Sequence, residues 1–130
     1  MSRAIESNLA IGLSSGTSMD GIDVALVRLD RSASPSAIEL LRFETYAYEG
    51  SLAEALRSAG VSALPTDLAL LDVMVGEAFA RAALRLLEAV GLASSKVGVI
   101  GSHGQTIVHL PEPTALAGSC ARASLQIGQP

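Results

Sequence analysis

The sequence is poor in aromatic residues and in positive charge. Only 3% of its residues are Phe, Trp or Tyr, so it lacks the stacking surfaces with which proteins usually hold single-stranded nucleic acid. Its formal net charge of −4 repels a nucleic acid backbone overall. These shortages predict that nucleic acid is not the partner, although backbone amides can still bind a small anion locally.

Cysteine, long apolar runs and a secretion signal are also lacking. The single cysteine, Cys120, excludes an internal disulfide bond. Residues 1–10 do not have the basic and then apolar order of a signal peptide. No stretch approaches the roughly 18 uninterrupted apolar residues of a membrane-spanning helix. The sequence therefore predicts a cytoplasmic protein with no membrane partner.

The spacing of His and Cys residues does not favour a metal site or a catalytic thiol. His103 and His109 are six residues apart and have no Cys or carboxylate at the spacing of a zinc site. Cys120 has no histidine close by in the sequence to activate a thiol. Neither a zinc site nor a catalytic cysteine is expected.

What is present is a high content of aliphatic residues in strand-like runs. Hydrophobic residues make up 49% of the 130 residues, enough for one domain with a buried core. Runs rich in Ile, Leu and Val predict buried strands at 9–13 and 22–29, and alternation predicts a third strand at 38–48. Short connections between them predict an antiparallel meander.

Two helices are expected after the third strand. The first spans 51–59 and is closed by Gly60, and the second spans 66–90, with Thr66 as its N-cap and Gly91 just beyond its end. Apolar residues at steps of three or four predict one buried stripe on the second helix. The stripe consists of Leu68, Leu71, Val75, Phe79, Ala82, Leu86 and Val90.

Further strands complete the predicted order. Residues 96–104 read as a buried strand that ends in a glycine turn. Short strands are expected at 106–109 and 124–127, separated by a loop that contains Pro111 and Pro113. The order β-β-β-α-β predicts an α/β fold, and it matches the first half of a ribonuclease-H-like unit.

The connection at residues 16–23 is longer than a strand hairpin needs. Gly16 and Gly21 can take positive φ, and such a loop can turn several amide N–H groups towards one phosphate. Asp20 and Asp23 add carboxylates, which bind Mg²⁺ together with phosphates and water. The alternative is an ordinary hairpin, because Asp-Gly alone favours a turn and no Walker motif is present.

A second glycine-containing stretch, GSHGQT at 101–106, follows a predicted strand, where α/β proteins usually place ligand-binding loops. His103, Gln105 and Thr106 can hydrogen-bond the hydroxyl or amide groups of a polar small molecule. A purely structural turn explains the same residues equally well.

Taken together, four stretches resemble the anhydro-N-acetylmuramic acid kinase family. They are GLSSGTSMDGIDVALV near the start, LDVMVGEAFARAA at 71–83, GSHGQTIVH at 101–109 and QIG at 126–128. The resemblance implies the actin/hexokinase-type ATPase fold, which has two ribonuclease-H-like lobes. Residues 1–130 are then expected to form a truncated N-terminal ATP-binding lobe, with the second lobe absent.

The resemblance also implies a reaction. Members of the family use ATP and Mg²⁺ to open the 1,6-anhydro ring of anhydro-N-acetylmuramic acid with water and to phosphorylate O6. The product, N-acetylmuramic acid 6-phosphate, belongs to cytoplasmic peptidoglycan recycling. The resemblance does not decide whether the full-length enzyme forms a homodimer.

By the same resemblance, particular residues are assigned to the ligands. Asp20 is expected to bind Mg²⁺, directly or through water. The ATP-binding residues are Gly16, Thr17, Ser18, Met19, Asp20, Gly21, Ile22 and Asp23. The residues on the sugar side are His103, Gly104, Gln105 and Thr106.

Two departures from the family pattern limit the expected activity. The family's D-T-G-P-G segment, whose aspartate acts as the general base, does not occur in these residues, so the base is expected beyond residue 130. Gln129 stands where the family has an aspartate. The 130 residues alone are expected to be inactive. A non-catalytic binding lobe and another sugar kinase of the same fold remain as alternatives.

Overall fold

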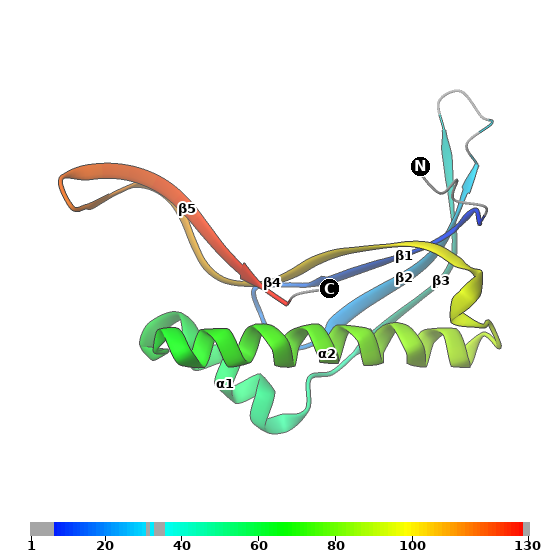
Figure 1. Ribbon diagram of the computed structural model, residues 1–130, viewed down its shortest axis with the longest axis horizontal. Coiled ribbons are helices and arrows are strands. Elements are labelled where there is room, and N and C mark those ends of the chain that lie inside the picture. Colours follow the sequence, from blue (N-terminus) through cyan, green and yellow to red (C-terminus); the bar gives the residue numbers. More distant parts are fainter. Residues whose placement is uncertain (1–6, 31, 33–35, 129–130) are drawn as a thin grey trace.

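A five-stranded mixed sheet with two helices on one of its faces forms the protein (Figure 1). The computed structural model describes residues 7–30, 32 and 36–128. The elements are β1 (Leu9–Ser15), β2 (Ile22–Asp30), β3 (Ala37–Tyr46), α1 (Gly50–Ser62), α2 (Pro65–Ala89), a 3₁₀ turn (Ser94–Lys96), β4 (Val97–Leu116) and β5 (Ser119–Ile127).

The strand order in the sheet is β3-β2-β1-β4-β5. The first three strands form the predicted antiparallel meander. The chain then crosses over through α1 and α2 to β4, which pairs in parallel with β1, and β5 returns antiparallel to β4. The predicted α/β fold class with its β-β-β-α-β order is confirmed.

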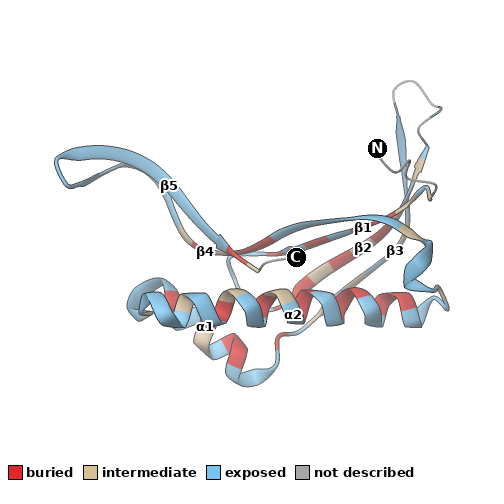
Figure 2. Cartoon of the chain, in the orientation of Figure 1, coloured by how far each residue is buried: buried red, intermediate tan, exposed pale blue. Residues whose placement is uncertain are grey.

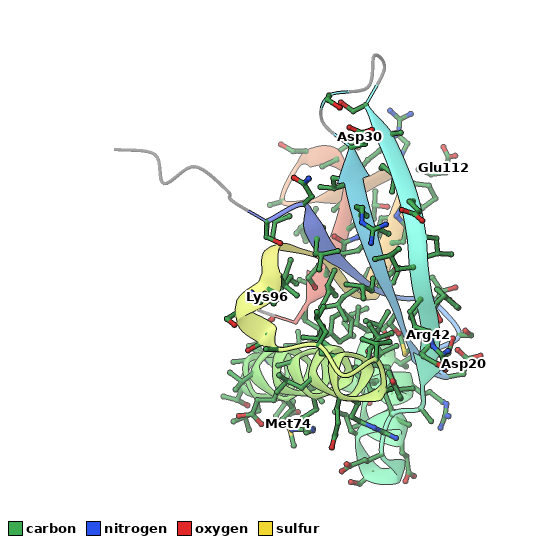
Figure 3. The ribbon with its side chains drawn as sticks, turned by 90° about the vertical axis from the view of Figure 1, so that its right-hand side faces the viewer. Asp20, Asp30, Arg42, Met74, Lys96 and Glu112 are labelled. Atoms are coloured by element: carbon green, nitrogen blue, oxygen red, sulfur yellow. The ribbon has the colours of Figure 1, made fainter. Side chains whose placement is uncertain are left out.

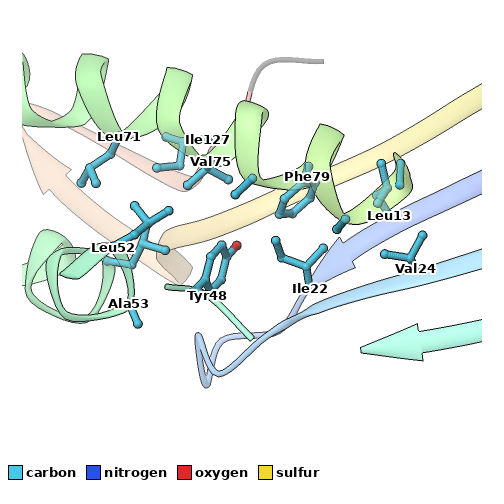
Figure 4. Packing of buried hydrophobic residues seen from close by; sticks show 14 of the residues in the cluster. Leu13, Ile22, Val24, Tyr48, Leu52, Ala53, Leu71, Val75, Phe79 and Ile127 are labelled. Carbon is cyan, nitrogen blue, oxygen red and sulfur yellow. The ribbon is translucent and has the colours of Figure 1, made fainter. Parts of the chain in front are cut away.

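The core lies between the sheet and α2. Alternate residues of β1 and β2, including Ile11 and Val24, point towards the helix because successive side chains of a strand face opposite sides. From α2, Val75, Phe79 and Leu86 meet them, and Figure 4 shows this packing around Val75 and Phe79. The predicted stripe is buried along its centre, whereas its terminal residues Leu68 and Val90 are only partly covered.

The other face of the sheet has no cover from the described residues, since α1 and α2 lie on the same side (Figures 2 and 3). The prediction that 96–104 is a buried strand is therefore wrong in part. The strand exists, but Val99 and Ile100 are 42% and 55% exposed. A strand rich in Val, Ile and Gly without polar alternation is typical of cover on both faces, so the sequence did not indicate the open face.

The first helix is longer at both ends than the predicted range of 51–59. α1 runs from Gly50 to Ser62, so Gly60 lies inside the helix instead of ending it. A Cβ on Gly60 would lie 2.8 Å from the carbonyl oxygen of Ile107 on β4. The glycine is thus explained by the close approach of a strand to the helix.

The start of α2 also differs from the prediction. Leu64 is the N-cap and Pro65 is the first helical residue, a position that suits proline because its missing N–H would be unpaired there anyway. Thr66 therefore does not cap the helix. Asp67 Oδ2 accepts a hydrogen bond from the Leu64 N–H at 3.0 Å, and this contact ties down the first turn.

Gly91 ends α2 as predicted. Its φ is +66°, its N–H donates to Glu88 O, and the Leu92 N–H donates to Leu87 O. This pair of bonds is the Schellman arrangement, in which a left-handed residue satisfies the last helical carbonyls.

Replacing Gly91 with Ala should lower the free energy of unfolding by about 1 kcal/mol, because a Cβ disfavours the left-handed conformation. No neighbouring atom lies within 4 Å of the new Cβ, so the effect isolates backbone strain. Urea denaturation measures it. Gly50→Ala is the matched control, since Gly50 is equally open and does not have positive φ. Equal stabilities of the two variants would contradict the assignment.

The C-terminal strands are longer than predicted. In place of two short strands and a proline-containing loop, β4 and β5 form one long hairpin that projects from the body (Figure 1). Its turn has Ala117 and Gly118 at φ 51° and 75°, the paired positive values of a type I′ turn. The two prolines fit because the register shifts between Leu110 and Thr114, where ladder bonds are interrupted.

Candidate functional site

The loop from Gly16 to Gly21 joins β1 to β2 at the carboxyl end of β1. The Met19 N–H donates to Gly16 O at 3.1 Å, which closes a turn. Met19, and neither of the two glycines, has the positive φ, at 54°. Its side chain is partly buried against the core, so it anchors the loop in a way that a glycine cannot. The prediction that Gly16 and Gly21 supply positive φ is wrong.

The two glycines of the loop serve different purposes. A Cβ on Gly21 would lie 2.9 Å from Thr45 Cγ2 and 3.1 Å from Tyr46 O, so Gly21 allows β3 to approach. A Cβ on Gly16 would meet only Ser18 Oγ, at 3.7 Å. The protein itself therefore leaves the space beside Gly16 free.

Three backbone donors of the loop have no acceptor. The N–H groups of Thr17, Ser18 and Asp20 make no hydrogen bond with any of the described residues, and all three residues are exposed. Free backbone amides in a glycine-containing loop can bind an anion when they point to the same place.

Two carboxylates flank these amides. Ser18 Oγ donates to Asp20 Oδ1 at 2.8 Å, and Thr45 Oγ1 donates to Asp23 Oδ1 at 2.6 Å. In both cases the second carboxylate oxygen stays available. Over the described part of the chain, no cluster of three or more His, Cys, Asp or Glu residues is placed to hold a metal ion. The residues therefore fit Mg²⁺ only together with phosphate oxygens and water.

The GSHGQT stretch is part of β4 and not a turn after it. Leu13 pairs with Ser102 and Ser15 pairs with Gln105, so β4 has one extra residue there. Gly104 has φ +73° within this bulge, and a Cβ on it would lie 2.5 Å from Ile127 O. The bulge turns the strand beside the loop, as bulges next to functional sites often do.

Asp23 and His103 both line an open hollow of about 630 Å³ on the uncovered sheet face. Its floor is nearly free of side chains, because Gly12 pairs with Ala25 on one side and with Gly101 on the other. Its wall residues come from four strands. They are Ser14, Asp23, Phe43, Ser102 and His103.

On its other side, His103 borders a smaller hollow of about 170 Å³ beside Gln126. Its Nε2 atom lies 3.2 Å from Gln126 Nε2, and the same amide donates to Thr106 Oγ1 at 3.4 Å. Asp72 of α2 closes the far end, where its Oδ1 accepts the Gly128 N–H at 2.6 Å. His103 and Thr106 are thus held in one polar cluster.

Gln105 differs from its predicted neighbours, because it has no exposed surface. It lies beneath the 16–21 loop and contacts Ser15, Gly16 and Tyr48. Burial raises the pKa of the Tyr48 hydroxyl above its ordinary value, and the Ser15 hydroxyl opposes part of this effect. The Tyr48 hydroxyl therefore stays protonated at neutral pH and can donate to Gln105.

Some residues predicted for the site lie elsewhere in the structure. Ile22, predicted to touch ATP, is 2% exposed and belongs to the core. Gln129 lies outside the described residues.

The sequence did not identify Ser15, Tyr48 and Asp72 as site residues, because each of them contacts a partner far away in the sequence. Only the position of Ser15 directly before the glycine loop offered a signal.

Comparison with known proteins identifies relatives over nearly the whole chain. The family model for anhydro-N-acetylmuramic acid kinase matches residues 8–130. The kinase of that name from Caldanaerobacter subterraneus subsp. tengcongensis is 39% identical over 127 residues, 96% of this chain and 32% of the relative. The Salinibacter ruber protein of the same name is 38% identical over 122 residues, 92% of this chain and 31% of the relative.

A third relative of the same name, from Xanthomonas campestris pv. campestris, is 49% identical over 109 residues, which are 82% of this chain and 29% of the relative. The chain thus spans about a third of the length of the curated relatives it matches. Among the described residues, no helix is long and apolar enough to cross a membrane. The match of the family model over residues 8–130 and the identities above place this chain in the anhydro-N-acetylmuramic acid kinase family.

Proposed function

We propose that these residues are the N-terminal ATP-binding lobe of an anhydro-N-acetylmuramic acid kinase, and that the 16–21 loop holds the phosphates of ATP. The observation that supports this most directly is the set of free N–H groups on Thr17, Ser18 and Asp20. They lie where β1 ends beside the parallel strand β4, the edge at which α/β sheets usually bind ligands.

Magnesium fits the same loop. The free carboxylate oxygen of Asp20 would hold the ion, directly or through water, and the phosphates would complete its shell. Bound Mg²⁺ would offset the negative charge that Asp20 and Asp23 bring close to the triphosphate. Without it, these carboxylates repel ATP.

The sugar is proposed to lie on the β4 side, within reach of His103 and Thr106, which can hydrogen-bond its hydroxyl or amide groups. In the proposed reaction water adds at C1 of the anhydro sugar, the C1–O6 bond opens, and O6 takes the terminal phosphoryl group of ATP. The general base implied by the family resemblance is not among these residues, so turnover needs groups outside them. The reaction would draw on cytoplasmic ATP.

The loop assignment is tested by titrating the 130-residue chain with ATP and Mg²⁺ while recording amide NMR shifts. The amides of Thr17, Ser18 and Asp20 should shift with Mg²⁺–ATP and not with adenosine, because only the phosphates reach them. Equal shifts with adenosine, or shifts confined to other parts of the sheet, would refute the assignment.

The role of Asp20 has its own signature. Asp20→Ala should weaken Mg²⁺–ATP binding about tenfold and should strengthen binding of metal-free ATP, because the removed carboxylate repels an unshielded triphosphate. Glu54→Ala, which removes an exposed carboxylate from α1, is the matched control and should change neither affinity. A change of the same sign in both titrations would contradict the magnesium role.

A further inference from the structure

Gln105 is the one fully buried polar side chain among the described residues, and it lies in a network of hydrogen bonds. Its Nε2 donates to Gly16 O at 3.0 Å and to Thr106 O at 3.1 Å. Its Oε1 lies 2.7 Å from Ser15 Oγ and 3.2 Å from Tyr48 OH, which donates to it. Both N–H groups of the carboxamide therefore have acceptors, and Tyr48 donates to its oxygen, while the one Ser15 hydroxyl proton lies within reach of both Gln105 Oε1 and Gly21 O.

These contacts lie at the two ends of the 16–21 loop. Gln105 holds the carbonyl of Gly16, the first residue of the loop, and Ser15 Oγ lies 2.7 Å from the carbonyl of Gly21, the last residue. Both carbonyls are therefore turned into the protein. Between them stand the residues with free N–H groups, Thr17, Ser18 and Asp20.

The orientation of the carbonyls matters for an anion site. A carbonyl oxygen pointing at the ligand would repel a phosphate, whereas amides pointing at it attract one. Hydrogen bonds in a buried network are strong and rigid, and a broken one leaves a costly unpaired group. Gln105 is thus placed to hold the loop in its anion-binding shape before the ligand arrives.

We propose that Gln105 is a positioning residue for the nucleotide: its buried amide, acting through the Gly16 carbonyl, holds the 16–21 loop with its free N–H groups ready for the phosphates. This inference rests on the proposed function of the loop. It differs from the sugar contact expected for Gln105 by family resemblance, because the side chain touches no open space. Gln105 also links the loop to β4, the strand that carries His103.

The test compares two variants of the same buried network. Gln105→Met keeps the side-chain length and removes both N–H donors, so the Gly16 carbonyl loses its partner. Tyr48→Phe removes one donor to the Oε1 atom and leaves the Gly16 contact intact. Both variants should destabilise the fold, and thermal unfolding followed by circular dichroism sets a temperature at which both are folded.

At that temperature, Gln105→Met should bind Mg²⁺–ATP about tenfold more weakly than the unsubstituted chain, whereas Tyr48→Phe should stay within about threefold. The amide NMR signals of Thr17, Ser18 and Asp20 should shift in Gln105→Met without ligand and keep their positions in Tyr48→Phe. If Gln105→Met does not fold, Gln105→Asn replaces it, since its shorter side chain withdraws the amide from Gly16.

The outcomes separate this inference from the proposal on which it rests. If the unsubstituted chain binds no Mg²⁺–ATP, the nucleotide assignment fails and this inference fails with it. If that chain binds Mg²⁺–ATP and both variants lose affinity equally, Gln105 has only a structural role and the inference alone is overturned. Unchanged affinity in a folded Gln105→Met or Gln105→Asn protein overturns it as well.

Discussion

Gly104→Ala is expected to lower the free energy of unfolding by roughly 3 kcal/mol, from left-handed strain and a backbone clash together. Gly104 has φ +73°, which a side chain disfavours. The new Cβ would also lie 2.5 Å from the carbonyl oxygen of Ile127, and backbone cannot move away as a flexible side chain can. The bulge in β4 would have to rearrange.

Gly101→Ala is the matched control for this effect. Gly101 lies on the same strand, does not have positive φ, and has no atom within 4 Å of an added Cβ. Its substitution should change the free energy of unfolding by less than about 0.5 kcal/mol. Urea denaturation of both variants decides the matter, and similar midpoints would show that the bulge does not require a glycine.

The functional consequence of Gly104→Ala follows from its neighbours. The bulge separates Ser102 from Gln105 along β4 and so sets which residues face the loop and which face the sugar side. A rearranged bulge would move Gln105 away from Gly16.

Leu86→Ala is the second substitution with a large expected effect, a loss of about 2–5 kcal/mol in the free energy of unfolding. Leu86 is 0% exposed on the buried face of α2, in the last turn of the helix. The truncation removes apolar contacts and leaves a cavity that the surrounding helix and sheet can close only in part.

Leu84 provides the comparison on the same helix. It is 57% exposed, so Leu84→Ala should cost less than about 0.5 kcal/mol and keeps helix propensity high. Thermal and urea unfolding of the two variants measure the difference. A comparable loss in both would mean that the buried face of α2 differs from the one in Figure 4.

Much of the fold was predictable because its signals are local. The meander of β1, β2 and β3 shows in apolar runs separated by turn residues, and α2 shows in its stripe around Val75 and Phe79. The end of α2 at Gly91 depends on a single residue that tolerates positive φ. In each case the residues that decide the structure are neighbours in the sequence.

The long hairpin was missed because its stability is not local. Pro111 and Pro113 are typical of loops, yet they lie within β4 because a register shift relative to β5 accommodates them. Likewise, the sequence predicted that Gly60 ends the first helix. A glycine is needed there because the Ile107 carbonyl, 47 residues away in the sequence, packs closely against α1. Pairing between distant segments overrides local preference.

In the candidate site, too, local features were predictable and contacts between distant segments were not. The loop at 16–21 was identified from its residue types, and its role as a nucleotide site remains a prediction. The sequence did not distinguish an exposed His103 from a buried Gln105 two positions later, because the bulge at Gly104 changes which side each faces.

By itself, the sequence determined the α/β class, the β-β-β-α-β order and the position of the glycine loop, because these follow from the hydrophobic period and from turn chemistry. Only the tertiary structure decided which side chains and backbone groups come into contact. Gln105 and Gly16 are 89 residues apart in the sequence and come within hydrogen-bond distance only because β4 pairs in parallel with β1. A buried carboxamide must satisfy every donor and acceptor, and only the folded chain supplies its partners.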